Sequence, residues 1–176
     1  MSKLISTTVR QWNVAPAFAE RYLRINFPDA SPDVSIDDLL ASKAELSQFY
    51  ARYALDTVNR GRGVFDRLRP HLVASAKRHL DIGAGYGGTS RVFAQNGFSS
   101  VAVEIDENLA AYTKANAEGL PIVVRNHSFL EQDVSGEGPF DVITMNQVIE
   151  HVADPPVAMS RLANLLKPGG VLLMET

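Results

Sequence analysis

Apolar and polar residues follow two different periodicities along the chain, and the change falls near residue 77. After it, short apolar runs alternate with segments in which apolar residues recur every three or four positions. The runs predict buried parallel strands, and the segments between them predict amphipathic helices. The expected strands are 80–82, 100–104, 121–125, 140–145 and 171–174; the expected helices are 89–96, 108–118 and 157–166, with a turn at 167–170. This alternation predicts an α/β fold, a doubly wound parallel sheet with helices on both faces.

Residues 1–76 show helical spacing and too few strand signals to join a sheet. Apolar positions predict a short helix over 17–27, followed by a proline-containing loop. Ser35 precedes two acids and predicts a helix start. That helix is expected to continue until Gly61 and Gly63 end or kink it, and another is expected over 64–73. We expect this N-terminal segment to pack over one edge or face of the sheet.

The junction between the first expected strand and its helix carries an acid and four glycines. Residues 79–88 read HLDIGAGYGG. Glycines remove the Cβ atoms that would keep a ligand away from the backbone, and the following helix directs free N–H groups into the same space. Read alone, the stretch fits both the G-x-G-x-x-G pattern of dinucleotide-binding folds and an acid-x-G-x-G-x-G pattern.

Asp81 favours the second pattern. An acid at the mouth of the turn would repel a pyrophosphate but would favour a positively charged ligand. With Asp81, Gly83, Gly85 and Gly87 the chain resembles the class I S-adenosylmethionine-dependent methyltransferases, whose cofactor carries a sulfonium and an ammonium group. The alternative is that Asp81 only braces the glycine loop through hydrogen bonds to its own backbone.

Two later stretches extend this resemblance to roughly residues 78–175. FDVITMNQVIEHVADP, at 140–155, resembles the fourth strand of the family with its following loop, and LLKPGGVLL, at 165–173, resembles the turn into the fifth strand. The resemblance implies a Rossmann-like, cofactor-binding domain over 77–176 and an N-terminal helical segment or lid over 1–76. The family has two further strands, so we expect the domain to be incomplete at its C-terminal side. Either the chain is a fragment, or a partner such as a second copy covers the fifth strand.

The resemblance implies S-adenosylmethionine as cofactor. Glu104 closes the second strand about 20 residues after the glycine turn, where a carboxylate accepts both ribose hydroxyls; a solvent-facing acid is the alternative. Ile105 would offer an apolar wall to the adenine. Which of the three residues 126–128 contacts the adenine is open, and a solvated histidine is one alternative there. The expected cofactor-binding residues are Asp81, Gly83, Ala84, Gly85, Gly87, Glu104, Ile105, Asn126, His127, Ser128, Asn146 and Gln147.

By the same resemblance, Glu150 and His151 lie near the donated methyl group. The pair is similar to that of small-molecule O-methyltransferases, including those of ubiquinone biosynthesis. His151 is the candidate base for an acceptor hydroxyl, with a purely structural role equally open, and Glu150 would orient it or cap the loop. Gln147 stands where some of these enzymes carry an acid, so no metal is expected. Tyr50 and Tyr53 would either form part of a lid or pack in a core.

Composition and charge exclude several kinds of site and binding partner. The chain has 176 residues, a formal net charge of −3 and no cysteine, which excludes disulfides and thiolate metal sites. No basic stripe predicts nucleic-acid binding, and no apolar run predicts a signal peptide or a membrane span. We therefore expect a cytoplasmic methyltransferase that acts on a small-molecule acceptor, at a hydroxyl oxygen, by in-line methyl transfer. An NAD-dependent oxidoreductase and a non-catalytic cofactor-binding fragment are the alternatives.

Overall fold

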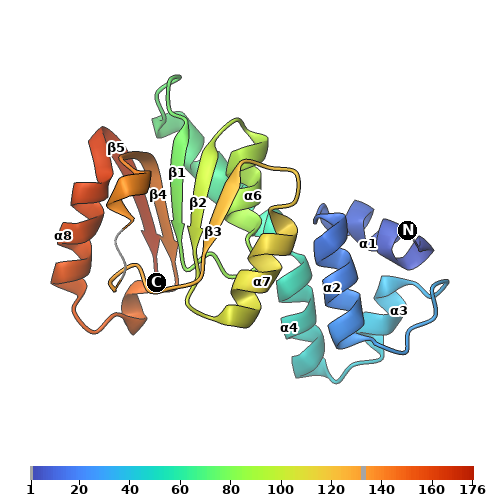
Figure 1. The fold of residues 1–176 in the computed structure, drawn as a ribbon. Helices are drawn as coiled ribbons and strands as arrows, with labels where there is room; N and C mark the ends of the chain where they lie inside the picture. The colour runs from blue at the N-terminus through green and yellow to red at the C-terminus, as the bar shows by residue number, and fades with distance from the viewer. Residues whose placement is uncertain (1, 132–133) are drawn as a thin grey trace.

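Five parallel strands form one sheet in the computed structural model, which describes residues 2–131 and 134–176 (Figure 1). The strands are β1 (Arg78–Ile82), β2 (Ser99–Val103), β3 (Ile122–Arg125), β4 (Phe140–Asn146) and β5 (Leu166–Glu175). Their order in the sheet is β3-β2-β1-β4-β5, and every neighbouring pair is parallel. The predicted α/β fold with a parallel sheet is confirmed.

The strand order reverses at β1, because the chain first builds outward to β3 and then crosses back to β4. The helices of this part are α6 (Gly88–Gln95), α7 (Glu107–Asn116) and α8 (Pro155–Leu165). Asp106 caps α7 by accepting from the Leu109 amide at 2.9 Å, and Asp154 caps α8 from the Val157 amide at 3.0 Å. In open α/β sheets, ligands bind outside the carboxyl ends of the strands at such a reversal point.

The N-terminal part is helical, as predicted, but its helices begin and end at other residues than the sequence predicts. Its helices are α1 (Lys3–Trp12), α2 (Pro16–Asn26), α3 (Ile36–Ala41), α4 (Glu45–Leu55) and α5 (Thr57–Leu68), followed by a 3₁₀ turn at Arg69–His71. The Ser35 cap is confirmed, since its hydroxyl accepts from the Asp38 amide at 3.1 Å. The single long helix expected after it is wrong: the chain breaks twice, which allows Leu40 and Leu55 to be fully buried in the same core.

Both faces of the sheet are covered (Figure 1). On one face, Val92 and Phe93 of α6 share a core with side chains from the N-terminal helices, and α2 contacts α7. On the other face, Ala158 and Leu162 of α8 pack with Leu80 and neighbouring strand residues. The expected packing of the N-terminal segment over one face is therefore present. Across the described residues, no helix is both long and apolar enough to cross a membrane.

The turn expected at 167–170 lies within β5. Phe140 of β4 pairs with Leu166, and the next pair joins Val142 to Val171, so the residues between them bulge out of the ladder. Gly169 has a φ of +77° and supplies the bend. The Gly169-Gly170 pair is typical of a turn, but residues on both sides of it pair with β4. As expected, β5 forms one edge of the sheet.

Candidate active site

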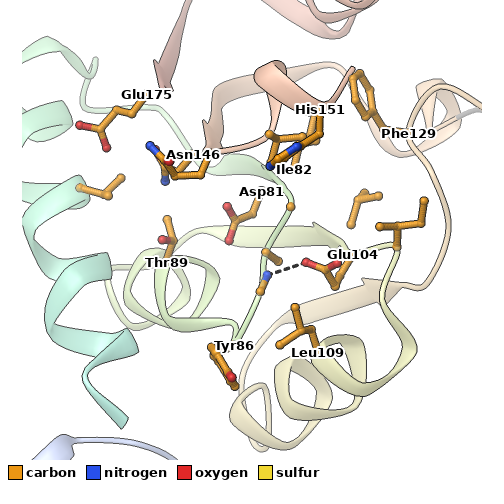
Figure 2. Close-up of a pocket in the computed structure, with 18 of the residues that line it drawn as sticks. Asp81, Ile82, Tyr86, Thr89, Glu104, Leu109, Phe129, Asn146, His151 and Glu175 are labelled. Atoms are coloured by element: carbon orange, nitrogen blue, oxygen red, sulfur yellow. Dashed lines mark hydrogen bonds between the residues drawn. The ribbon is translucent and has the colours of Figure 1, made fainter. Parts of the chain in front are cut away.

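A cavity of about 820 Å³ opens at the carboxyl ends of β1, β2 and β4, beside the reversal of strand order (Figure 2). Its volume is in the usual range for small-molecule sites. The sequence-predicted residues that line it are Asp81, Gly83, Ala84, Gly85, Glu104, Ile105, His127, Ser128, Asn146, Gln147 and His151. Gly87, Asn126 and Glu150 do not line it.

Asp81 lies at the floor of the cavity, with only 2% of its surface exposed. Its Oδ2 accepts from the Ser90 amide at 3.1 Å and from the Ser90 hydroxyl at 2.7 Å, and its Oδ1 accepts from the Thr144 hydroxyl at 2.8 Å. Burial raises the pKa of Asp81, and these hydrogen bonds oppose the rise. The carboxylate therefore braces the first turn of α6 from below while it remains part of the cavity wall.

The glycine loop separates ligand contact from helix packing. Gly85 has a φ of +56°, and a Cβ there would meet nothing nearer than 4.0 Å, because it would project into open space. Gly87 also has a positive φ, but a Cβ there would lie 2.9 Å from the Thr113 Cα of α7. Gly87 caps α6 and lets α7 approach, so its place in the expected cofactor set is not supported by the shape of the cavity.

Glu104 faces the same cavity from the end of β2 (Figure 2). Its Oε2 accepts from the Gly85 amide at 2.8 Å and its Oε1 from the Asp106 amide at 2.9 Å. Only 6% of the residue is exposed, so the alternative of a solvent-facing acid is wrong. Two backbone donors fix the carboxylate, and each oxygen keeps a lone pair for a further donor.

The loop after β3 contributes to the wall in an unexpected way. His127 and Ser128 line the cavity, followed by Phe129, which is 4% exposed and was not predicted. Asn126 instead donates to the backbone oxygens of Glu104 at 2.8 Å and Ile105 at 3.1 Å. Its amide therefore holds the loop after β2 in place and does not reach the cavity.

The end of β4 carries local strain and an unsatisfied acceptor. Gln147 has a φ of +54°, which is uncommon for a residue with a side chain, and its amide donates to the Glu175 carbonyl at 2.8 Å. Among the described residues, the buried Oδ1 of Asn146 has no hydrogen-bond partner. Strained backbone and orphaned polar atoms collect at functional sites, where a ligand completes them.

His151 lies in a 3₁₀ turn at Ile149–His151, and its ring lines the cavity near Asn146 (Figure 2). Its backbone amide donates to the Val148 carbonyl at 2.9 Å. Glu150 is exposed on the outer side of the turn. In the part of the chain that the structure describes, no three or more His, Asp or Glu side chains form a group that could hold a metal ion.

The profile of one protein family, described as "Methyltransferase domain", matches residues 44–176. The chain belongs to this methyltransferase domain family. The resemblance inferred from the glycine loop and the two later motifs is thereby confirmed.

Relatives of the methyltransferase domain carry similar names. A ubiquinone biosynthesis O-methyltransferase from Caulobacter sp. (strain K31) is 32% identical over 97% of this chain and 66% of its own length. One from Caulobacter vibrioides is 41% identical over 55% of this chain and 39% of its own length. The chain therefore spans less than two thirds of either relative.

Solved structures share the fold. CalS10, an amino pentose methyltransferase from Micromonospora echinaspora solved with S-adenosylmethionine, has a TM-score of 0.60 and 20% identity over 75% of this chain and 56% of its own. A Haemonchus contortus phosphoethanolamine N-methyltransferase, solved with S-adenosylhomocysteine, has a TM-score of 0.57 and 26% identity over 66% of this chain and 27% of its own.

One wall of the methyltransferase domain's cavity escaped the sequence analysis. Five residues spaced three or four apart line it from the end of α4 and along α5: Tyr53, Thr57, Arg60, Val64 and Arg67. The spacing is the signal that could have revealed this face, but Gly61 and Gly63, which are expected to end or kink the helix, interrupt the pattern. Of the two lid candidates only Tyr53 lines the cavity. Tyr50 and Tyr53 are 61% and 46% exposed, so the alternative of core packing is wrong for both.

The two arginines on this wall have different surroundings. Arg67 forms an ion pair with Glu175 at 2.8 Å, which ties α5 to the end of β5. The Arg60 guanidinium lies over the Tyr53 ring, 3.5 Å from its centroid, and donates to the Tyr53 carbonyl. Within the described ranges, no carboxylate lies within ion-pair distance of Arg60. Burial lowers the pKa of Arg60, so a bound anion would stabilise its charge.

Proposed function

We propose that this chain binds S-adenosylmethionine and transfers its methyl group to a hydroxyl oxygen of a small-molecule acceptor. The observation that carries the proposal is the pair of buried acids, Asp81 and Glu104, around one glycine-lined cavity at the reversal of strand order. Family membership and the names of the relatives support it. The acceptor, the activity of the whole protein and a cytoplasmic location remain proposals.

The groups around the cavity fit the charges of this cofactor. The fixed Glu104 carboxylate suits the ribose hydroxyls, and the orphaned Oδ1 of Asn146 suits the ammonium group. Arg60, which forms no ion pair with a carboxylate among the described residues, suits the cofactor's own carboxylate. The adenine would be faced by His127, Ser128 and the ring of Phe129.

When bound, the cofactor would supply an electrophilic methyl group: an acceptor oxygen would form a bond to the methyl carbon in line with the sulfur, and the sulfur would leave as the neutral thioether of S-adenosylhomocysteine. The chain's contribution is to hold the acceptor opposite the sulfur and to exclude water, and positioning of this kind lowers a barrier by several kcal/mol. His151, on the cavity wall, is proposed to remove the hydroxyl proton, since histidine is the side chain that most often acts as a general base. Glu150 is exposed and outside the cavity, so a role for it would be indirect.

Two other functions make different predictions. An NAD-dependent oxidoreductase would need a site for a pyrophosphate, which the buried Asp81 beneath the glycine loop disfavours. A non-catalytic binding module would hold S-adenosylmethionine without turnover. Pairing of two copies through the β5 edge remains a further prediction, separate from the cofactor.

Calorimetry with S-adenosylmethionine, S-adenosylhomocysteine and NAD tests the cofactor. We expect both nucleosides to bind and NAD not to bind. Glu104→Ala should weaken nucleoside binding about tenfold or more, because it removes charge-assisted hydrogen bonds. Glu107→Ala, which replaces an exposed acid at the first position of α7, is the matched control and should bind normally. Binding of NAD alone, or normal binding by Glu104→Ala, would contradict the proposal.

A further inference from the structure

His79 is a completely buried histidine that the proposed chemistry does not use. It lies in β1 with its ring stacked on Phe93, at 3.8 Å between centroids and 13° between planes. Its Nδ1 lies 3.1 Å from the Ser100 hydroxyl of β2, and its Nε2 lies 2.8 Å from the Thr144 hydroxyl of β4. Burial lowers the pKa of His79 to about 3, so the ring is neutral near pH 7.

The Thr144 hydroxyl connects this histidine to the cavity. It lies between His79 Nε2 and Asp81 Oδ1, at 2.8 Å from each, and all three residues are buried. Asp81 accepts from Ser90 through its other oxygen. A chain of buried hydrogen bonds therefore runs from the core of the sheet to the floor of the cavity and the first turn of α6.

When Asp81 is ionised, the chemistry of these groups sets the direction of the hydrogen-bond chain. An ionised Asp81 can only accept, so the single Thr144 proton must point to it. Thr144 can then only accept from His79, which requires the proton of the neutral ring to be on Nε2. Nδ1 is left as an acceptor for the Ser100 hydroxyl. Each donor in this arrangement has one acceptor.

We propose that His79 is a positioning residue for the cofactor site: by donating to Thr144 it directs the Thr144 proton onto Asp81 and so holds that carboxylate in its place under the glycine loop. The proposal rests on the proposed function, because it concerns the site of a positively charged cofactor. Asp81 needs this support because burial raises its pKa, and the charge of Glu104, the other acid of the site, adds to this rise to a smaller extent. Without the donor, the buried Thr144 oxygen loses a hydrogen-bond partner, and the hydroxyl that donates to Asp81 is held less firmly.

The opposite direction defines the result that would overturn the proposal. A protonated Asp81 would donate to Thr144, Thr144 to His79 Nε2, and Nδ1 would carry the proton toward Ser100. The Ser100 hydroxyl would then have to donate to the Ser90 carbonyl, which lies 3.5 Å away. That distance is long for a hydroxyl donor, so the geometry favours the first direction.

Nitrogen NMR of the cofactor-free protein tests the direction without any ligand. With ¹⁵N-labelled histidine, and with His79→Gln to assign the signals, we expect His79 to be neutral and protonated on Nε2. A proton on Nδ1 would overturn the proposal. Because no cofactor is present, this result is independent of whether the proposed function is right.

Affinity for S-adenosylhomocysteine tests the consequence. His79→Phe keeps a stacked ring but loses the donor, and Thr144→Val keeps the shape but loses the link; each should weaken binding about tenfold. The double variant should be little weaker than either single variant, because both break one chain. Thr144→Ser keeps the hydroxyl and should bind S-adenosylhomocysteine normally.

Thr8→Val is the matched control. Thr8 is also completely buried and donates its hydroxyl to the Leu4 carbonyl at 2.8 Å, far from the cavity. It should lose stability in urea unfolding but bind S-adenosylhomocysteine normally. Normal binding by folded His79→Phe and Thr144→Val, with only their stability reduced, would show a purely structural histidine and overturn the proposal. Absence of binding by the unaltered protein would instead refute the proposed function.

Discussion

Gly61 of α5 lies so close to Gly88 of α6 that a Cβ atom on Gly61 would be 2.6 Å from the Gly88 carbonyl carbon. A Cβ on Gly88 would lie 2.1 Å from the Thr57 carbonyl oxygen, and the Gly88 amide donates to the Thr57 hydroxyl at 3.2 Å. Gly88 is the first residue of α6 and follows the glycine loop. The contact therefore fixes α5, which carries Arg60 and Arg67 on the cavity wall, against the glycine loop.

The first prediction compares two glycines of α5. Gly61→Ala should destabilise the fold by about 1–3 kcal/mol, because its methyl group would overlap the backbone of α6. Gly63→Ala, two residues further on, should stabilise it by up to about 1 kcal/mol, because a Cβ there meets nothing within 4 Å and alanine favours helix. Urea unfolding measures both. Equal effects at the two positions would contradict the close contact.

The same glycine shows where sequence reasoning reaches its limit for the fold. Strands and helices after residue 77 were predictable, because each is a local pattern of burial bounded by caps and glycines. Gly61 reads as a helix end when its neighbours are unknown, yet it is buried inside α5 to admit α6. The break between α3 and α4 likewise depends on a shared core that local periodicity does not contain.

For the site, too, some residues could be predicted from the sequence and others could not. Asp81 and Glu104 could be placed at the cavity because they end neighbouring strands, and strand ends meet at one edge of a parallel sheet. Whether a loop side chain points inward could not be read, so Asn126 was expected in the cavity but supports a backbone turn. Arg60 comes from α5, which reaches the cavity by packing against α6, a contact between segments that local sequence patterns do not contain.

A second prediction concerns the charge on the α5 wall. Arg60→Gln should weaken S-adenosylhomocysteine about tenfold, because a paired charge is lost. It should leave 5′-methylthioadenosine, which lacks the amino-acid part, nearly unaffected. Arg62→Gln, an exposed arginine of the same helix, is the control. Calorimetry measures the affinity of each variant for each ligand. An equal loss of affinity for both ligands would show that Arg60 acts on the nucleoside or on the fold.

A third prediction separates chemistry from binding at His151. His151→Ala should slow methyl transfer to a hydroxyl acceptor about a hundredfold or more, the usual contribution of a general base. Affinity for S-adenosylhomocysteine should stay unchanged, because His151 is assigned to the acceptor. His71→Ala, an exposed histidine outside the cavity, should be fully active. The readout is S-adenosylhomocysteine formed from an acceptor found by screening; unchanged turnover would remove His151 as the base.

The last prediction follows from the buried imidazole. Burial lowers the pKa of His79 from 6.5 to about 3 in the folded state, so between these values the unfolded chain binds more protons. The stabilisation is fully present above pH 6.5 and is lost as the pH falls, by up to about 1.4 kcal/mol per pH unit. Asp81 acts in the opposite sense, because burial raises its pKa and the folded state gains its proton first.

Comparison with a variant isolates the histidine from this opposing acid. His79→Gln should be less stable than the unaltered protein near neutral pH, because it loses stacking and an ordered hydrogen bond. The difference in free energy of unfolding should shrink by about 2 kcal/mol on acidification to about pH 5, because glutamine does not titrate. Thr8→Val, which keeps His79, should run parallel to the unaltered protein at every pH. A constant difference between His79→Gln and the unaltered protein would mean that the folded and unfolded chains protonate His79 equally readily, so that burial does not lower the pKa of His79 and Nδ1 is not kept as an acceptor for the Ser100 hydroxyl.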